Sequence, residues 1–213
     1  MTDRVSFLRR FGRDEAGTTV VELAIVVPLL LLMLFALIDY GRLFWIESMA
    51  QKATSIAART AAVRPPVCNN VPTTIAAVAT TPGNAAPKYG TLCQGSGVCA
   101  SGGEQTCALN TGTTTGQEIW DRIEALMPPG STPANVRLRY IFDGRIGFLG
   151  GPYSPIVTVE LVNLNFNFVL PLGGLVALAA SDATQQSAFA NSIALPNMSV
   201  SLPGEDLASG ASN

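Results

Sequence analysis

An unbroken apolar run near the N-terminus constrains this chain more than any other feature. Every residue from Leu23 to Ile38 is apolar, and Val20 and Val21 extend the run toward the ~20 residues that cross a bilayer as a helix. A buried core helix is the alternative. Polar residues flank the run on both sides, however, which is the pattern that membrane insertion recognises. The run therefore predicts one transmembrane helix.

The distribution of basic residues predicts how that helix is oriented. The residues before the run are rich in arginine, whereas the first basic residue after it is Arg42. Because basic residues collect on the cytoplasmic side, the N-terminus is expected in the cytoplasm. Only 13% of all residues are charged, against about 25% in a typical soluble domain, and this also favours a membrane-associated chain.

Composition excludes several classes of function. The net charge is −2 without any basic cluster, so a nucleic-acid partner is not expected. The chain has no histidine, which removes histidine triads and most catalytic zinc sites. The acids of the C-terminal part are scattered along the sequence and are simplest as surface charges: Asp121, Glu124, Asp143 and Glu160. We therefore predict neither an enzyme nor a bound cofactor or metal.

The N-terminal leader has its own processing signal. The apolar run continues into Ile-Asp-Tyr-Gly-Arg without the small-residue cleavage site of a secretory signal peptide, which indicates an anchor that is retained. Upstream, Gly17 precedes Glu22 by five residues, between the arginine-rich leader and the run. This arrangement resembles a type IV prepilin signal. The resemblance implies that a prepilin peptidase cuts between Gly17 and Thr18, where a glycine leaves room for the enzyme.

The similarity extends beyond the leader. Residues 16–62 resemble the TadE-like family, the pseudopilins of tight-adherence (Tad) pili, through Gly17, Glu22, Pro28, the Asp39-Tyr40-Gly41-Arg42 motif and the Ala-Ala-Arg of residues 57–59. The resemblance implies a pseudopilin of the bacterial inner membrane that packs with other pilin subunits and with the pilus assembly machinery. Leu23 stands where major prepilins of this system have an aromatic residue, which favours a minor pseudopilin.

Glu22 is an acid at the edge of a membrane span, and two explanations are open. Its side chain can reach the cytoplasmic interface, where the charge stays hydrated. Alternatively, cleavage creates an amine on Thr18, one helical turn away, that can pair with Glu22. The resemblance implies a third use, in which the acid of one subunit meets the amine of a neighbour and fixes their axial register.

The helix is expected to continue past the membrane. Apolar residues recur at helical spacing from Leu43 to Ala57, and Pro65-Pro66 then stops the helix. We therefore predict one helix over residues 18–64, whose second half is an amphipathic stalk. The apolar stripe of this stalk packs either on the C-terminal part of the chain or on neighbouring helices in an assembly.

Residues 65–116 are predicted to be a Thr/Gly-rich loop region without a core of its own. This region holds all four cysteines, Cys68, Cys93, Cys99 and Cys107. An even number of cysteines outside the cytoplasm favours two disulfides, and four cysteines allow three connectivities. Metal binding is the alternative, but the spacing contains no C-x2-C pair.

The C-terminal part is expected to form a small α+β region over residues 117–203. A helix is predicted at 117–127, strands in "NVRLRYIF" and "PIVTVELVNLNFNFVLPL" with a bulge near Val162 and Asn163, and one or two further strands in "NSIALPNMSVSLPGED". Residues 204–213 are predicted to be a flexible tail. The predicted fold class is α+β, a leader at 1–17 and a long transmembrane and stalk helix followed by a small antiparallel sheet, as in pilins. An unprocessed, membrane-anchored adhesion module is the alternative function.

Overall fold

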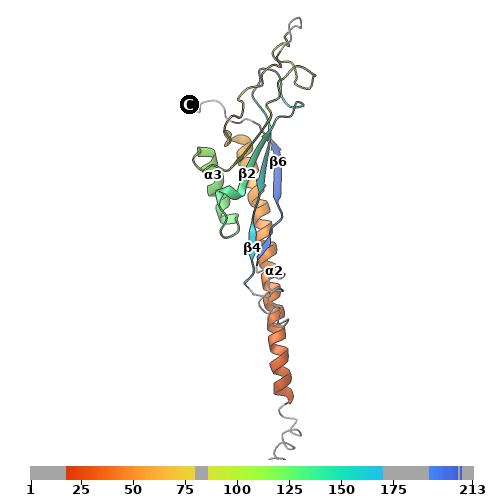
Figure 1. The fold of residues 1–213 in the computed structure, drawn as a ribbon, viewed down its shortest axis with the longest axis vertical. Helices are drawn as coiled ribbons and strands as arrows, with labels where there is room; N and C mark the ends of the chain where they lie inside the picture. Colours follow the sequence, from red (N-terminus) through yellow and green to blue (C-terminus); the bar gives the residue numbers. More distant parts are fainter. Residues whose placement is uncertain (1–17, 80–85, 170–191, 206, 208–213) are drawn as a thin grey trace, which may run out of the picture. The chain divides into compact units, whose positions relative to one another are not determined.

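The computed structural model describes residues 18–79, 86–169, 192–205 and 207 (Figure 1). The chain divides into two compact units. The first comprises Met1–Leu43 with Phe168–Asn191, and the second comprises Phe44–Asn167 with Ser192–Asn213. The predicted leader at 1–17 lies outside the described residues.

Helix α2 (Thr18–Val63) contains 46 residues and contributes to both units. It confirms the predicted long N-terminal helix, with Pro28 inside it. The helix ends just before Arg64 and Pro65-Pro66, because two successive prolines lack the backbone donors that the last turn requires. At 1.5 Å per residue, α2 is about 70 Å long, roughly twice the thickness of a bilayer's hydrocarbon core.

The second unit contains a four-stranded antiparallel sheet in the order β1-β2-β3-β6. Its strands are β1 (Glu104–Ala108), β2 (Val136–Ile141), β3 (Ile156–Leu161) and β6 (Met198–Pro203). Two shorter strands, β4 (Asn165–Asn167) and β5 (Ser192–Ala194), pair as a separate ribbon. A long helix with a small antiparallel sheet confirms the predicted α+β fold class.

Strand β1 corrects the prediction that residues 65–116 are loop alone. Its sequence, Glu-Gln-Thr-Cys-Ala, lacks the large β-branched and aromatic side chains that mark a strand. The segment is extended because it pairs along its whole length with β2, from Glu104 opposite Ile141 to Ala108 opposite Arg137. Tertiary pairing thus overrides a weak local preference.

The strand predicted over residues 155–172, with a bulge near Val162 and Asn163, is also corrected, and residues 170–172 lie outside the described residues. The chain breaks after Leu161, where Asn163 takes a left-handed conformation with φ 56°. The Asn135 side-chain amide donates to the carbonyls of both Val162 and Asn163, at 3.1 Å each. The predicted bulge is therefore a turn between two sheets, held by an asparagine from another part of the chain.

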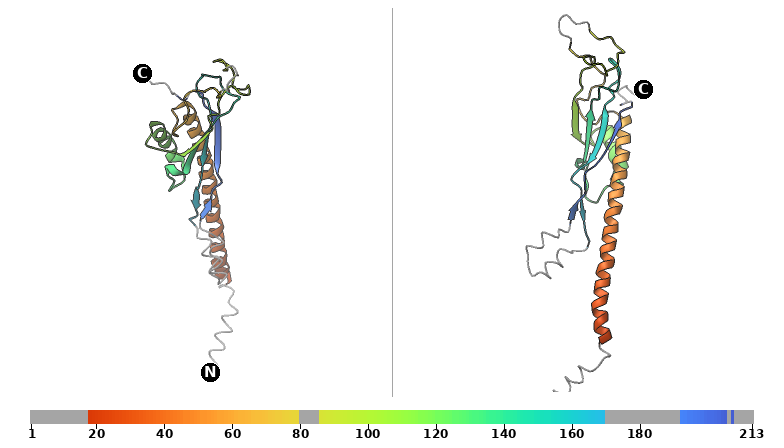
Figure 2. Two further views of the ribbon diagram at one scale, coloured as in Figure 1. Left: turned by 45° about the horizontal axis from the view of Figure 1, so that its top comes forward. Right: turned by 90° about the vertical axis from the view of Figure 1, so that its right-hand side faces the viewer.

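One face of the sheet forms the core of the second unit. Val136, Leu138 and Tyr140 alternate along β2 on this face and are fully buried, opposite Leu161, Val159 and Val157 of β3. The part of α2 that belongs to this unit lies along one face of the sheet (Figure 2). It buries a stripe of small residues: Ala50, Ala53, Thr54, Ala57, Ala58 and Ala61. Of the two partners considered for the stalk, its own C-terminal domain covers this stripe.

Helix α3 (Thr114–Ile123) and the 3-10 turns η2 (Glu124–Leu126) and η3 (Pro133–Asn135) complete the second unit. The predicted helix at 117–127 begins three residues earlier than expected. Thr113 caps it by accepting a hydrogen bond from the Gly116 N–H at 3.0 Å. Ile119 and Ile123 are the fully buried residues of this helix.

The packed chain continues beyond Pro203, into the range predicted to be a flexible tail. The Gly204 N–H donates to the Pro155 carbonyl at 2.7 Å, and the Glu205 N–H donates to the Ala62 carbonyl at 3.1 Å. Leu207 is buried. The C-terminal segment therefore packs on both the sheet and the end of α2.

Candidate functional site along helix α2

The N-terminal end of α2 carries the predicted processing and pairing residues. Gly17 lies outside the described residues, and Thr18 is the first residue of the helix. Glu22 lies four residues further on, one helical turn away, and is exposed. The geometry of the backbone therefore allows an amine on Thr18 to approach the Glu22 carboxylate, as the spacing predicts.

The apolar part of α2 is the candidate membrane anchor. Among the described residues, α2 is the one helix that is long and apolar enough to cross a membrane. Its most apolar 18-residue window has a mean hydropathy of 2.9, and none of that window is buried. A core helix of a soluble protein hides such residues inside the fold. The exposed span therefore needs lipid or other helices around it.

Asp39 follows the apolar run directly and is buried, with its side chain only 6% exposed. Its Oδ1 accepts a hydrogen bond from Arg42 Nη1 at 2.9 Å, and its Oδ2 accepts one from the Val169 N–H at 3.0 Å. A buried carboxylate is costly unless charge and hydrogen bonds compensate it, and here it has both. The Tyr40 ring also meets the Phe168 ring edge-on, with centroids 5.9 Å apart.

The Asp39-Tyr40-Gly41-Arg42 motif thus has a local task in the first unit. It holds the chain at Phe168 and Val169 against α2, across a separation of about 130 residues. The sequence identifies the motif through its resemblance, but nothing in the sequence indicates the partner. A backbone N–H supplies the long-range bond, and every residue except proline has that group.

The structure pairs all four cysteines in two disulfides and selects one of the three possible connectivities. Cys68 bonds Cys107, 39 residues away, and Cys93 bonds Cys99, 6 residues away. Cys68 follows the end of α2, whereas Cys107 lies in β1. The first bridge therefore ties the end of the long helix to the edge of the sheet. The second closes a small loop.

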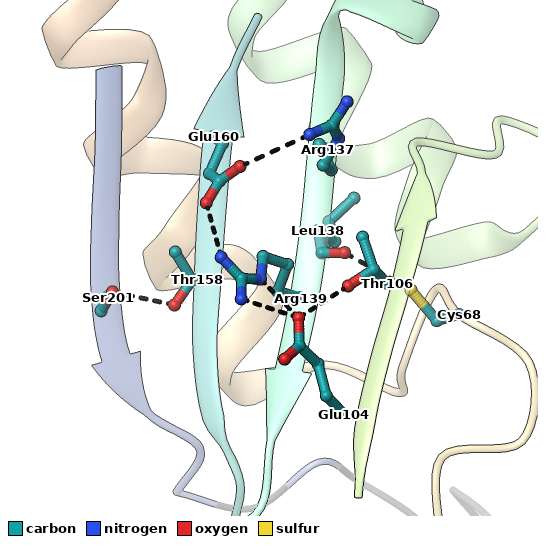
Figure 3. A network of polar contacts seen from close by, with 9 residues as sticks. All are labelled: Cys68, Glu104, Thr106, Arg137, Leu138, Arg139, Thr158, Glu160 and Ser201. Carbon is teal, nitrogen blue, oxygen red and sulfur yellow. Dashed lines mark hydrogen bonds and ion pairs between the residues drawn. The ribbon is translucent and has the colours of Figure 1, made fainter. Parts of the chain in front are cut away.

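Charged side chains form a ladder on the sheet face opposite α2 (Figure 3). Arg139 on β2 bonds Glu104 on β1 through Nε at 2.8 Å, and it bonds Glu160 on β3 through Nη1 at 3.2 Å. The hydrogen bonds to Glu104 and then to Glu160 raise the pKa of Arg139 above its ordinary value. Arg137 lies opposite Glu160, with Nη1 4.0 Å from Oε2. The ladder pairs its own charges, which suits a hydrated sheet surface.

Three of the four scattered acids have a partner close by in the structure. Glu160 belongs to the ladder, and Asp121 accepts a hydrogen bond from the Gln117 amide at 2.7 Å on the surface of α3. Asp143 accepts one from the Arg145 N–H at 2.9 Å in the loop after β2. Each of these three acids thus has a local partner in its own element or on a neighbouring strand.

Comparison with known proteins covers one segment of the chain. No curated protein and no solved structure matches the chain. Residues 17–59, about a fifth of the chain, match the family model described as TadE-like protein. The match contains Glu22, the apolar span, the Asp39 motif and most of the alanine stripe, and it ends before the sheet.

The matching family consists of pilus components rather than enzymes. Together with the exposed apolar span, the match supports a membrane protein associated with a Tad pilus, and it suggests other pilus subunits as partners. It also confirms the resemblance seen in the sequence. Over residues 17–59, the N-terminal segment of this chain is thus similar to the TadE-like family.

Proposed function

We propose that this protein is a minor pseudopilin of a Tad-type pilus, anchored by α2 in the inner membrane and active through helix packing. The observation that carries the proposal is the division of α2 into two parts. Residues from Ala50 to Ala61 bury a small-residue stripe within the second unit, whereas the apolar span before Asp39 contains no buried residue. The exposed part is therefore available for lipid and for the helices of other subunits.

The proposed topology places the N-terminus in the cytoplasm and the second unit outside the cytoplasmic membrane. The arginines before the span support the first part. The two disulfides support the second, because such bonds persist in oxidising compartments.

Glu22 has the central role in this proposal. A charge near the centre of a bilayer costs roughly 3 kcal/mol or more, so an acid at the edge of the span needs either water or a partner. Prepilin peptidase would cut after Gly17 and leave a positive amine on Thr18. The Glu22 carboxylate of one subunit then meets the amine of a neighbour, and the pair sets how far one helix slides along the next.

The experiment replaces Glu22 with leucine and with glutamine, and measures pilus production at equal membrane abundance. Both variants should insert and be cleaved at least in part, but they should lose assembly because the amine has no carboxylate to meet. Glu47→Leu is the matched control, since Glu47 is another acid of α2 that lies beyond the span. Assembly by Glu22→Leu at the level of the parent would return Glu22 to a simple interfacial role.

The position of the mature N-terminus distinguishes this proposal from the alternative, an unprocessed adhesion module. Mass spectrometry of protein isolated from membranes should find a chain that begins at Thr18. A chain that keeps residues 1–17 would favour the adhesion module, which needs no peptidase and no register between subunits.

A further inference from the structure

The end of the apolar span carries a second apolar element, and it comes from the C-terminal half of the chain. Phe168 and Val169 meet α2 at Tyr40 and Asp39, through the ring contact at 5.9 Å and the hydrogen bond at 3.0 Å. We call Tyr40, Phe168 and Val169 the exit patch. All three residues belong to the first compact unit, together with the span itself.

The exit patch remains open to its surroundings although its members contact each other. Val169 is 72% exposed and Tyr40 is 51% exposed. An exposed valine beside an exposed aromatic ring is unfavourable in water, and it is ordinary for residues that meet lipid. The patch therefore exposes apolar side chains, as the apolar span before it does.

The position of the patch along α2 matches the boundary of a bilayer. Tyr40 is two residues past Ile38, the end of the apolar run, which is about 3 Å along a helix. The headgroup layer on each side of a bilayer is roughly 5–8 Å thick. Tyr40 thus falls in this layer when α2 spans the membrane, and tyrosine is one of the residues enriched there.

Two polar groups at the patch, the Val169 N–H and the Asp39 carboxylate, have partners, which lowers the cost of placing them where water is scarce. The Val169 N–H donates to Asp39, and the Asp39 charge is compensated by Arg42. The sequence after Val169 has the same chemistry. Residues 170–180 contain only Leu, Pro, Gly, Val and Ala, and the first charged residue is Asp182.

We propose that the exit patch is a second membrane contact, at which the C-terminal half of the chain enters the outer interface of a phospholipid bilayer beside the anchor helix. The inference rests on the proposed function in that α2 must span the membrane. It adds that Val169 and its neighbours touch lipid, so the protein is held at two points that are far apart in sequence.

The test places a tryptophan at the patch and measures its depth. Val169→Trp is made in the full-length chain with Trp45→Phe and Trp120→Phe, and the protein is reconstituted into phosphatidylcholine vesicles. The vesicles carry bromine on the acyl chains, either close to the glycerol backbone or near the chain ends. Leu31→Trp, in the middle of the span, is the positive control. Tyr89→Trp, an exposed position in the second unit, is the negative control.

The proposal predicts that Val169→Trp loses fluorescence with the shallow bromines more than with the deep ones, whereas Leu31→Trp shows the reverse and Tyr89→Trp is unchanged. Fluorescence of Val169→Trp that matches Tyr89→Trp, while Leu31→Trp is quenched, would overturn the second contact and leave the anchor intact. If Leu31→Trp is not quenched, the anchor itself fails, and the proposed function fails with it. Peptide mapping of both disulfides verifies that each variant has folded.

Discussion

Removing the Cys68–Cys107 disulfide is expected to destabilise the second unit more than removing Cys93–Cys99. A disulfide stabilises a fold mainly by restricting the unfolded chain, and the effect grows with the loop that it closes. Separations of 39 and 6 residues correspond to about 4 and about 2 kcal/mol of unfolding free energy, respectively. The longer bridge also holds β1, an edge strand with few buried side chains of its own.

The two disulfides are well matched for this comparison. Each joins one buried cysteine, Cys68 or Cys93, to one that is half-buried, Cys107 or Cys99, so replacement by alanine removes similar packing at both sites. The double variants are made in the full chain and unfolded with urea in detergent, with the sheet and helix signals followed by circular dichroism. The reasoning fails if the two double variants lose the same unfolding free energy, or if the variant without Cys93–Cys99 loses more. Either result would show that the length of the closed loop does not determine how much each disulfide stabilises this unit.

Four further predictions concern processing and the buried tyrosines. If a prepilin peptidase cuts after Gly17 as proposed, Gly17→Trp should leave the leader attached, because an indole is far larger than the hydrogen atom that it replaces. A mature chain that begins at Thr18 would contradict this. Tyr140→Phe should cost about 1–3 kcal/mol, because the Val67 N–H loses the hydroxyl that accepts its hydrogen bond at 3.2 Å. Tyr153→Phe should change the free energy of unfolding little, because among the described residues the buried Tyr153 hydroxyl has no hydrogen-bond partner. Urea unfolding of the Tyr140→Phe and Tyr153→Phe variants measures both changes. Burial raises the pKa of both hydroxyls above 10.0, so the native state keeps protons that the unfolded state loses, and unfolding free energy should fall as the pH rises above about 10. The double Phe variant should show a weaker fall.

The sequence was most informative where one local rule decides the structure. The length of α2 follows from an apolar run, a helical stripe and two prolines, all of which lie within the helix or directly after it. The strands β2 and β3 follow from alternation, because one face of each is buried against the core and the other carries Arg139 and Glu160. In these elements the local preference and the tertiary environment agree.

The sequence was least informative where a segment distant in the chain determines the local structure. The strand character of β1 depends on β2, and the break at Asn163 is fixed by the Asn135 side chain. The same holds for the site. Glu22 and the Asp39 motif can be found from their positions around the apolar run, but the docking of Val169 on Asp39 depends on a backbone group that has no sequence signature.

The alanine stripe implies that mutations along α2 obey opposite rules in its two parts. From Ala50 to Ala61 the limit is volume, because fully buried alanines leave no space for an added methylene group, so even leucine or valine is expected to be rejected there. Before Asp39, in the proposed membrane span, the limit is polarity, because large apolar residues can replace one another in lipid while a single charge is costly. A library of substitutions scored for membrane abundance should therefore show tolerance that depends on side-chain size in one segment of the helix and on charge in the other.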